Sequence, residues 1–141
     1  MNNVDGLIEH LDFLARNLSG FDKTYIVKII LLEVGVPTRG RGFDYVEEAV
    51  LLRYEDPMRL LSKEIYPTIA KEFHTSATIQ QVEKMINRAI ERAWQNRDGI
   101  WEIYFSQSQK PTNTEFISRM ARVLEMVCDR SKFLRCVEGG E

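Results

Sequence analysis

Six side chains that can hydrogen-bond to the edges of base pairs fall within a span of nine residues. They are Gln80, Gln81, Glu83, Lys84, Asn87 and Arg88. Glutamine and asparagine pair with adenine through two hydrogen bonds, lysine and arginine donate to guanine, and glutamate accepts from cytosine. Each good pair contributes about 1–3 kcal/mol of discrimination between bases. These residue types predict contacts to the bases of double-stranded DNA, provided that one element presents them together.

The spacing of apolar residues predicts that a single helix does so, from about Ile79 to Asn96. Its apolar stripe consists of Ile79, Val82, Ile86, Ala89, Ile90 and Ala93. When Ile86 points to the core, the six polar side chains lie on the opposite face, with Glu83 towards one flank. Thr78 and Gln81 form a capping box that would start this helix. Taken alone, such a face is more often only the solvated side of an amphipathic helix.

The segment before this helix favours DNA binding. Residues 66–94 read YPTIAKEF, HTSAT and IQQVEKMINRAIERAW, which predicts a short helix, a polar turn and a longer amphipathic helix. This order is typical of a helix-turn-helix, whose second helix lies in the major groove. Ala70 is expected where the two helices cross, with Phe73 and Val82 as apolar contacts. Side chains that could reach phosphates, or could equally be ordinary surface groups, are Arg39, Arg41, Lys63, Lys71 and Thr75.

The other elements are also predicted to be helical, so the expected fold is all-α with about six to seven helices. Apolar residues repeat at helical spacing over 4–18, and the first helix is expected to turn Ile8 inward. Asp22 can cap a second helix, which would bury Tyr25 and end at Gly35 and Pro37. A third helix is expected from about Phe43 to Glu55, after the flexible basic loop at 38–42.

Prolines shape the middle of the chain. Asp56 and Pro57 are expected to cap and open a further helix, and Pro67 is expected to force a restart. An irregular stretch with Trp101, Tyr104 and Phe105 should fold back onto the core. Thr112 and Glu115 form a second capping box for a last helix that would run to about Leu134. Its predicted inward residues are Phe116, Met120, Val123, Leu124 and Val127.

These elements predict three parts. Residues 1–20 form an amphipathic N-terminal helix, residues 21–135 form a helix-turn-helix effector-like domain, and residues 136–141 form a flexible tail. The N-terminal helix would either seal the core or pair two copies of the chain.

Composition limits the classes of function. The net charge is -2, which is low for a DNA-binding domain, although phosphate binding depends on local clusters of charge. No apolar run could span a bilayer and no secretory signal is evident, so a cytoplasmic, nucleoid-associated protein without membrane contact is expected. Cys128 and Cys136 are expected to be reduced packing residues. We find no nucleophile with a base, no phosphate-binding glycine loop and no metal-ligand spacing, and therefore expect neither an enzyme nor a cofactor or metal.

Four stretches of the chain resemble a known family, in the family's order. They read EVGVPTRGRGFDYVEEAV at 33–50, IYPTIAKEF at 65–73, VEKMINRAIERAW at 82–94 and KPTNTEFISRMARVL at 110–124. They resemble the C-terminal DNA-binding effector domain of the master response regulator of sporulation initiation in Bacillus and Clostridium relatives. The resemblance implies about six helices, binding to short boxes similar to TGTCGAA, often by two copies in tandem, and contact with RNA polymerase sigma factor.

The resemblance also implies roles for single residues. In the family the recognition helix reads V-E-R-A-I-R-H-A-I-E, and its Glu and the following Arg contact bases. Glu83 takes the Glu position and Lys84 stands at the base-reading Arg. Asn87 stands at the second Arg and Arg88 at the His. Lysine lacks the planar fork of arginine, and asparagine removes a positive charge.

Two segments differ in length from the family. The turn HTSATIQQ is about two residues longer, and the segment from Trp94 to Lys110 is shorter. Nothing before residue 22 resembles the family's receiver domain. The sequence therefore predicts a sequence-specific, DNA-binding transcription regulator that is not controlled by a receiver of its own. The alternative is a protein-interaction module, or antagonist, that kept the fold and lost specific DNA binding.

Overall fold

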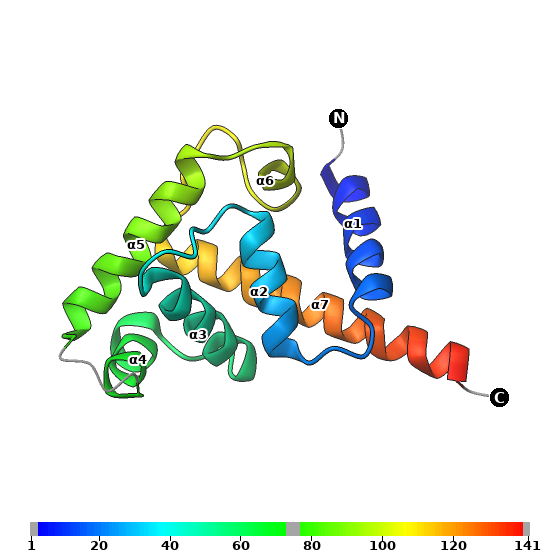
Figure 1. The fold of residues 1–141 in the computed structure, drawn as a ribbon, viewed down its shortest axis with the longest axis horizontal. Coiled ribbons are helices and arrows are strands. Elements are labelled where there is room, and N and C mark those ends of the chain that lie inside the picture. Colours follow the sequence, from blue (N-terminus) through cyan, green and yellow to red (C-terminus); the bar gives the residue numbers. More distant parts are fainter. Residues whose placement is uncertain (1–2, 73–76, 140–141) are drawn as a thin grey trace.

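The computed structural model describes residues 3–72 and 77–139, and its regular elements are helices (Figure 1). They are α1 (Asn3–Asn17), α2 (Lys23–Glu33), α3 (Gly42–Glu55), the π-helical turn η1 (Leu61–Ile65), α4 (Tyr66–Glu72), α5 (Ile79–Gln95), α6 (Gly99–Tyr104) and α7 (Asn113–Gly139). The described residues contain no strand, which confirms the predicted all-α class.

The long helix α7 holds the other helices together, because it contacts α1, α2, α3 and α5. It runs behind α2 and α3 in Figure 1. Its predicted inward residues are all buried: Phe116, Met120, Val123, Leu124 and Val127. The helix continues to Gly139, whereas the sequence predicted an end near Leu134, so most of the predicted tail at 136–141 is helical.

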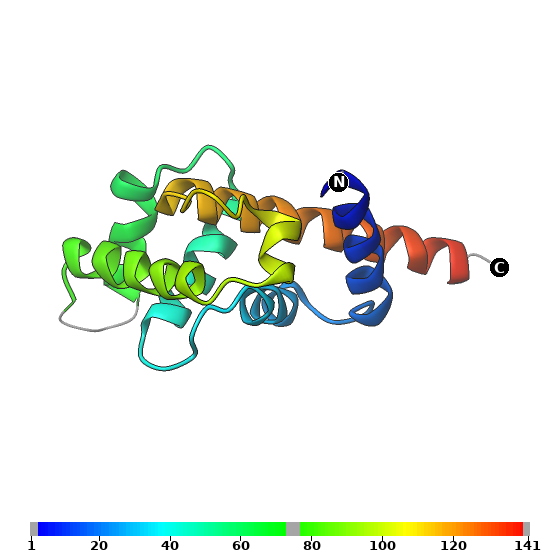
Figure 2. The same ribbon diagram turned by 90° about the horizontal axis from the view of Figure 1, so that it is seen from above.

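The N-terminal helix α1 lies at the opposite end of the molecule from α4 and α5 in both ribbon views (Figures 1 and 2). Its Leu11 and Leu14 are buried in the same core cluster as the rest of the chain. Ser131 donates a hydrogen bond of 3.2 Å to the carbonyl oxygen of Ala15 and joins α1 to the later part of α7. This packing is the core-sealing arrangement that the sequence offered as one of two expectations for α1.

Three predicted helix caps are confirmed. The carboxylate of Asp22 accepts from the N–H of Tyr25 at 3.0 Å. Thr78 and Gln81 satisfy each other's backbone N–H at the start of α5, with distances of 2.7 and 3.1 Å. Thr112 and Glu115 make the equivalent pair before α7, both at 3.1 Å. Each cap fixes where its helix begins and how its first turn is oriented.

The prediction that Pro57 opens a helix is wrong. The carboxylate of Asp56 accepts from the N–H of Met58 at 3.0 Å, which makes a tight turn, and the next regular element begins only at Leu61. The side chains of Arg53 and Arg59 stabilise this turn by donating to the carbonyl oxygens of Arg59 and Leu52, respectively. The local side-chain hydrogen bond to the backbone therefore competes successfully with helix formation.

The predicted break at Pro67 takes the form of a widened helical turn. In η1 the N–H of Ile65 bonds to the carbonyl of Leu60, and that of Tyr66 bonds to Leu61, both with i→i−5 spacing. Pro67 has no N–H and cannot make the bond that a regular helix would need at that place. The π-turn lets the chain pass into α4 without a gap, and Tyr66 keeps a helical conformation.

Several predicted inward residues lie at the edge of the core instead. Tyr25, Ile79 and Ile8 are 44%, 40% and 44% exposed, respectively, so these predictions are wrong. The stretch predicted to be irregular contains the short helix α6. Its Trp101 and Tyr104 are buried, as expected. Within residues 3–72 and 77–139, no helix has the length and apolar character needed to cross a membrane.

Candidate nucleic-acid interface

The six predicted base-contacting residues lie together on α5, and all are exposed. We call this set the polar strip (Gln80, Gln81, Glu83, Lys84, Asn87 and Arg88). The opposite face of α5 is anchored by the buried residues Val82, Ile86, Ala89, Ile90 and Ala93. Figure 1 shows α5 along one side of the molecule, and α5 contacts the short helix α4. The structure therefore presents the strip outward on a helix whose other face is fixed.

A groove of about 870 Å³ runs along one side of the strip. The strip contributes Gln80, Glu83, Lys84 and Asn87 to it, and the far wall includes Arg53, Leu60 and residues 110–114. Two residues that line the groove are joined to each other, because the amide of Asn113 donates to the hydroxyl of Tyr66 at 3.1 Å. Burial raises the pKa of Tyr66, so this phenol stays neutral at physiological pH.

Lys110 reaches the middle of the polar strip, which the site prediction missed. Its Nζ lies 2.5 Å from a carboxylate oxygen of Glu91 and donates to Oδ1 of Asn87 at 3.3 Å. The signal for this residue was present, because Lys110 begins the KPTN element that carries the family resemblance. Lys110 neutralises Glu91 and places a positive charge beside Asn87, while the amide NH₂ of Asn87 stays available.

The strip residues differ in how free their side chains are. Oε1 of Gln81 accepts from the N–H of Thr78 at 2.7 Å, so this side chain is partly committed to the helix cap. The side chains of Gln80, Lys84 and Arg88 have no hydrogen bond or ion pair with the described residues. Their donors and acceptors are therefore available to a ligand.

A second hollow, of about 220 Å³, lies on the other side of α5 and is rich in arginine. We call it the arginine pocket, and it is lined by Pro37, Arg39, Gly40, Arg41, Gly42, Met85, Arg88, Ala89 and Arg92. The structure thus brings the predicted phosphate-contacting residues Arg39 and Arg41 to α5. Arg88 lines this pocket instead of the groove. Arg92 was missed, although its i+4 spacing from Arg88 places both on one helix face.

Gly42 allows the basic loop to approach α5 closely. A Cβ atom at this position would lie 3.2 Å from both the Cβ of Ala89 and the carbonyl oxygen of Met85. Both ribbon views show the loop before α3 beside α5 (Figures 1 and 2). The missing side chain therefore explains how the two pairs of arginines come to line one hollow.

The other predicted phosphate contacts are not assembled with these. Lys63 in η1 and Lys71 in α4 are exposed and line neither the groove nor the arginine pocket. Thr75 lies outside the described residues. Near the end of α4, Glu72 lies close to Glu48 of α3, and burial followed by the charge of Glu72 raises the pKa of Glu48.

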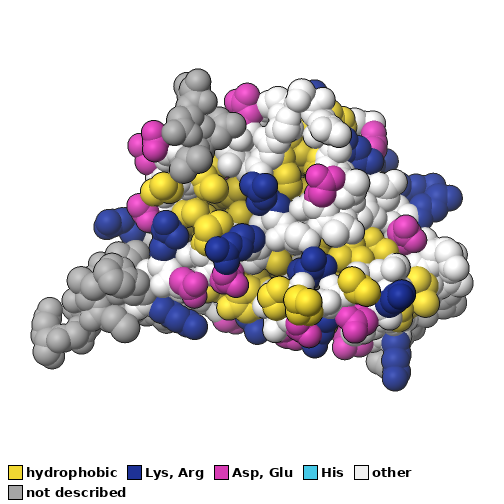
Figure 3. Space-filling model, turned by 180° about the vertical axis from the view of Figure 1, so that it is seen from behind, with side chains coloured by type: hydrophobic (Ala, Val, Ile, Leu, Met, Phe, Trp, Pro, Cys, Tyr) yellow, Lys and Arg dark blue, Asp and Glu magenta, His cyan; other side chains and the backbone are white. Residues whose placement is uncertain are grey.

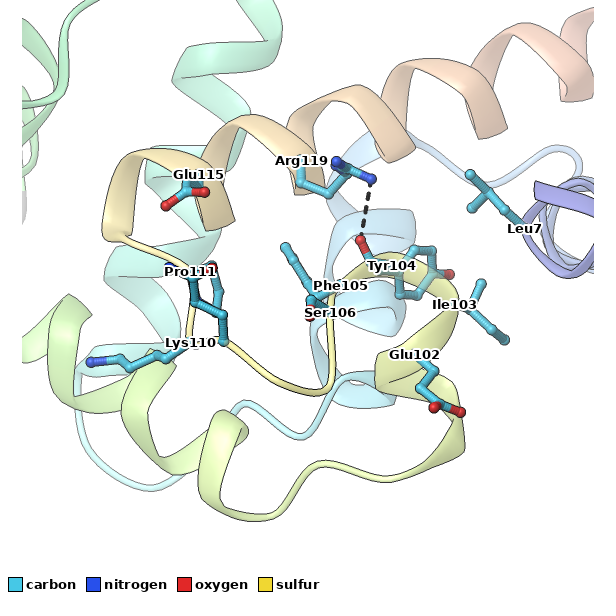
Figure 4. Close-up of a pocket in the computed structure, with 11 residues that line it drawn as sticks. Leu7, Glu102, Ile103, Tyr104, Phe105, Ser106, Lys110, Pro111, Glu115 and Arg119 are labelled. Carbon is cyan, nitrogen blue, oxygen red and sulfur yellow. Dashed lines mark hydrogen bonds between the residues drawn. The ribbon is translucent and has the colours of Figure 1, made fainter. Parts of the chain in front are cut away.

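Another pocket, of about 430 Å³, lies between α6, the following segment and α7, with Leu7 of α1 at its edge (Figure 4). Arg119 donates to the carbonyl oxygen of Tyr104 at 3.2 Å on its wall. Its lining combines the acids Glu102 and Glu115 with two basic residues. The face of the molecule seen in Figure 3 likewise mixes basic, acidic and hydrophobic side chains. Neither surface carries charge of a single sign, unlike the arginine pocket.

A short helix followed by a longer helix with an outward polar strip and basic flanks defines a DNA-binding domain of the helix-turn-helix class. The family model described as "Sporulation initiation factor Spo0A C terminal" matches residues 27–124, and the chain belongs to this family. It is a DNA-binding effector domain of the sporulation-initiation type, which confirms the resemblance seen in the motifs. The matched region contains both hollows beside α5, and α1 lies before it.

Proposed function

We propose that this chain is a sequence-specific regulator of transcription that lays α5 in the major groove of its target. The observation that carries the proposal is the outward polar strip on a helix with a fixed register. The Thr78–Gln81 capping box sets the start of α5, and the buried stripe from Val82 to Ala93 sets its rotation. A helix in the major groove can reach the donor and acceptor pattern of each base pair.

Individual side chains support particular contacts. Lys84 is exposed and unpaired, and its three donors suit the acceptors of guanine. Glu83 beside it can accept from the amino group of cytosine, and Gln80 can pair with adenine. Asn87 contributes its amide NH₂, because Lys110 already occupies its oxygen. Lysine acts as a point donor and not as a planar fork, so discrimination at that guanine should be weaker than an arginine would give.

Family membership supports the choice of target and partners. The proposed target is a box similar to TGTCGAA, with two copies of the chain on tandem boxes. The proposed protein partner is RNA polymerase sigma factor. We further propose that residues 1–20 and 21–135 act as one folded body, since α1 and α7 share a core.

A fluorescence anisotropy titration tests this function. The full chain is titrated into a labelled TGTCGAA-containing duplex and into a scrambled duplex of the same composition, at several salt concentrations. We expect tighter binding to the first duplex and a steep loss of affinity with salt, because each neutralised phosphate releases counterions. Equal affinity for both duplexes would contradict sequence-specific reading and favour the protein-interaction alternative. That alternative predicts capture of a partner that survives nuclease treatment.

A further inference from the structure

We propose that the arginine pocket is a binding site for one phosphate group of the DNA backbone. This inference rests on the proposed function and adds to it a phosphate-binding residue, Arg92, and a changed role for Arg88. The pocket joins two parts of the chain that are far apart in sequence. Arg39 and Arg41 come from the loop before α3, and Arg88 and Arg92 come from the last half of α5.

The charge of the pocket is unbalanced. None of the described residues that line it is acidic, and none of its four guanidinium groups makes a hydrogen bond or ion pair with a described residue. Several basic side chains elsewhere are paired with an acid, as in Lys110–Glu91 and Arg130–Asp12. In a chain of net charge -2, four unpaired guanidinium groups around one hollow repel one another. An anion in the hollow would replace that repulsion with attraction.

The chemistry of the lining suits phosphate oxygens. A guanidinium group has donors arranged as a planar fork, which matches two phosphate oxygens at once. The lining also includes Arg41 and Gly42, the N-cap and the first residue of the 14-residue helix α3, which has no side-chain cap. The first N–H groups of a helix favour negative charge. The hollow of about 220 Å³ has room for several waters, at about 30 Å³ each, and therefore for a phosphate group.

The position of the pocket fits a duplex held by α5. A helix in the major groove lies between two sugar–phosphate backbones, and the polar strip is flanked by the groove on one side and the arginine pocket on the other. Lys84 belongs to the groove side and Arg88 to the pocket side. Arg88 is therefore assigned to the backbone and not to a base. This assignment predicts that Arg88 and Arg92 contribute affinity without sequence preference.

Salt-dependent DNA titrations test the pocket. Arg92→Ala and Arg39→Ala are compared with Arg16→Ala, an exposed arginine on α1 that is remote from α5. We expect each pocket variant to bind roughly five- to tenfold more weakly to the target and the scrambled duplex alike. The slope of log K against log salt concentration should fall by about 1 in magnitude. Arg16→Ala should change neither quantity. Thermal unfolding followed by circular dichroism checks that the exposed substitutions leave the fold intact.

A scan with single methylphosphonate linkages, which remove one backbone charge at a time, identifies the bound phosphate. A methylphosphonate at one backbone position should weaken binding by the wild type. The same linkage should not weaken binding by Arg92→Ala any further, because that variant has already lost the contact. Wild-type salt dependence in the pocket variants, or additive losses at every position, would overturn the proposal. If the wild type discriminates between duplexes and the pocket variants keep its salt slope, only this inference fails. If binding shows no sequence preference but the salt slope falls in the pocket variants, the phosphate-site proposal is supported and the proposal of base reading fails. Absence of any duplex binding would overturn both.

Discussion

Nζ of Lys110 lies 3.3 Å from Oδ1 of Asn87, so a residue just before α7 contacts the centre of the polar strip on α5. The same ammonium group pairs with Glu91 at 2.5 Å. One lysine therefore performs two tasks at the edge of the groove. It cancels an acidic charge on α5, and it binds the side-chain oxygen that Asn87 would use, together with its NH₂ group, to pair with adenine.

Replacement of Lys110 by alanine should weaken binding to every duplex, because it removes one positive charge and leaves Glu91 unpaired beside the DNA. We expect a loss of roughly tenfold in affinity, and a gain in preference for adenine opposite Asn87. Selection of bound sequences from a random duplex pool measures both effects. Lys132→Ala, an exposed lysine on α7, serves as the control and should leave affinity unchanged. If Lys110→Ala binds DNA as tightly as the wild type, the groove does not lie against the duplex.

Lys84 is expected to discriminate between bases, and Lys71 is not. Lys84→Ala should remove preference at one guanine and cost roughly 1–3 kcal/mol on the target duplex. Lys71→Ala should weaken target and scrambled duplexes to the same small extent, as expected for a phosphate contact. Anisotropy titrations with single-base variants of the box distinguish these outcomes. If neither change affects affinity, the strip is not a DNA-binding face.

The capping box of α5 should make a measurable contribution to the free energy of unfolding. Thr78→Ala removes the hydroxyl oxygen that accepts from the N–H of Gln81 at 3.1 Å, and this should cost about 1 kcal/mol of unfolding free energy. Urea denaturation followed by circular dichroism gives the value. The control is Thr38→Ala at an exposed loop position, which should change stability by less than about 0.5 kcal/mol. Equal effects of the two substitutions would argue against the cap.

Two glycine substitutions should act in opposite directions. A Cβ at Gly42 would meet Ala89 and the backbone of Met85 at 3.2 Å, so Gly42→Ala should destabilise the protein by about 1 kcal/mol or more and reduce DNA affinity. Gly6 lies within α1, and a Cβ added there would meet no atom within 4 Å apart from its chain neighbours and the nearby backbone of its own helix, so Gly6→Ala should stabilise by about 0.5–1 kcal/mol. Thermal and urea unfolding compare the pair. A stabilised Gly42→Ala variant would show that the loop does not depend on close approach.

Glu48 should make stability depend on pH. Burial and the nearby charge of Glu72 raise the pKa of Glu48 in the folded state, so the ionised carboxylate is less favourable there than in the unfolded chain. The free-energy cost of holding Glu48 ionised in the folded state is present at pH 7. It disappears below about pH 4, where the carboxyl group is protonated in both the folded and the unfolded state. Glu48→Gln should therefore stabilise the protein at pH 7, by less than about 1 kcal/mol because solvent screens the charges, and not at pH 4. Glu102→Gln, an exposed acid, is the control in the same unfolding series.

The sequence predicted the helices whose signals are local. The caps at Asp22, Thr78 and Thr112 could be predicted because each depends only on a hydrogen bond between a side chain and a backbone N–H a few residues away. The turn at Asp56 and Pro57 was misread because the same residue types can cap a helix or close a turn. In the structure Asp56 accepts from the N–H of Met58, and the side chains of Arg53 and Arg59 donate to carbonyl oxygens six and seven residues away, which holds the turn form.

The site was predicted in part for the same reason. Membership in the polar strip depends on helical spacing alone, and all six residues lie where the periodicity predicted. Contacts between residues far apart in the chain could not be predicted from helical spacing. Lys110 meets Asn87 across 23 residues, and the approach of Arg41 to Arg92 depends on the space left at Gly42. Such contacts follow from packing, which a single sequence does not display.

The separation of α1 from α5 has a practical consequence for measurements on this protein. Asp12 and Ala15 of α1 are tied to Arg130 and Ser131, far along α7 from its first turn beside the groove. A fluorophore or fusion partner joined ahead of α1 would stand at the far end of the molecule from α5, the helix proposed to read bases. Labelling through that end leaves the helix free to dock, whereas a dye on Lys84 or Arg92 would obstruct the contact being measured.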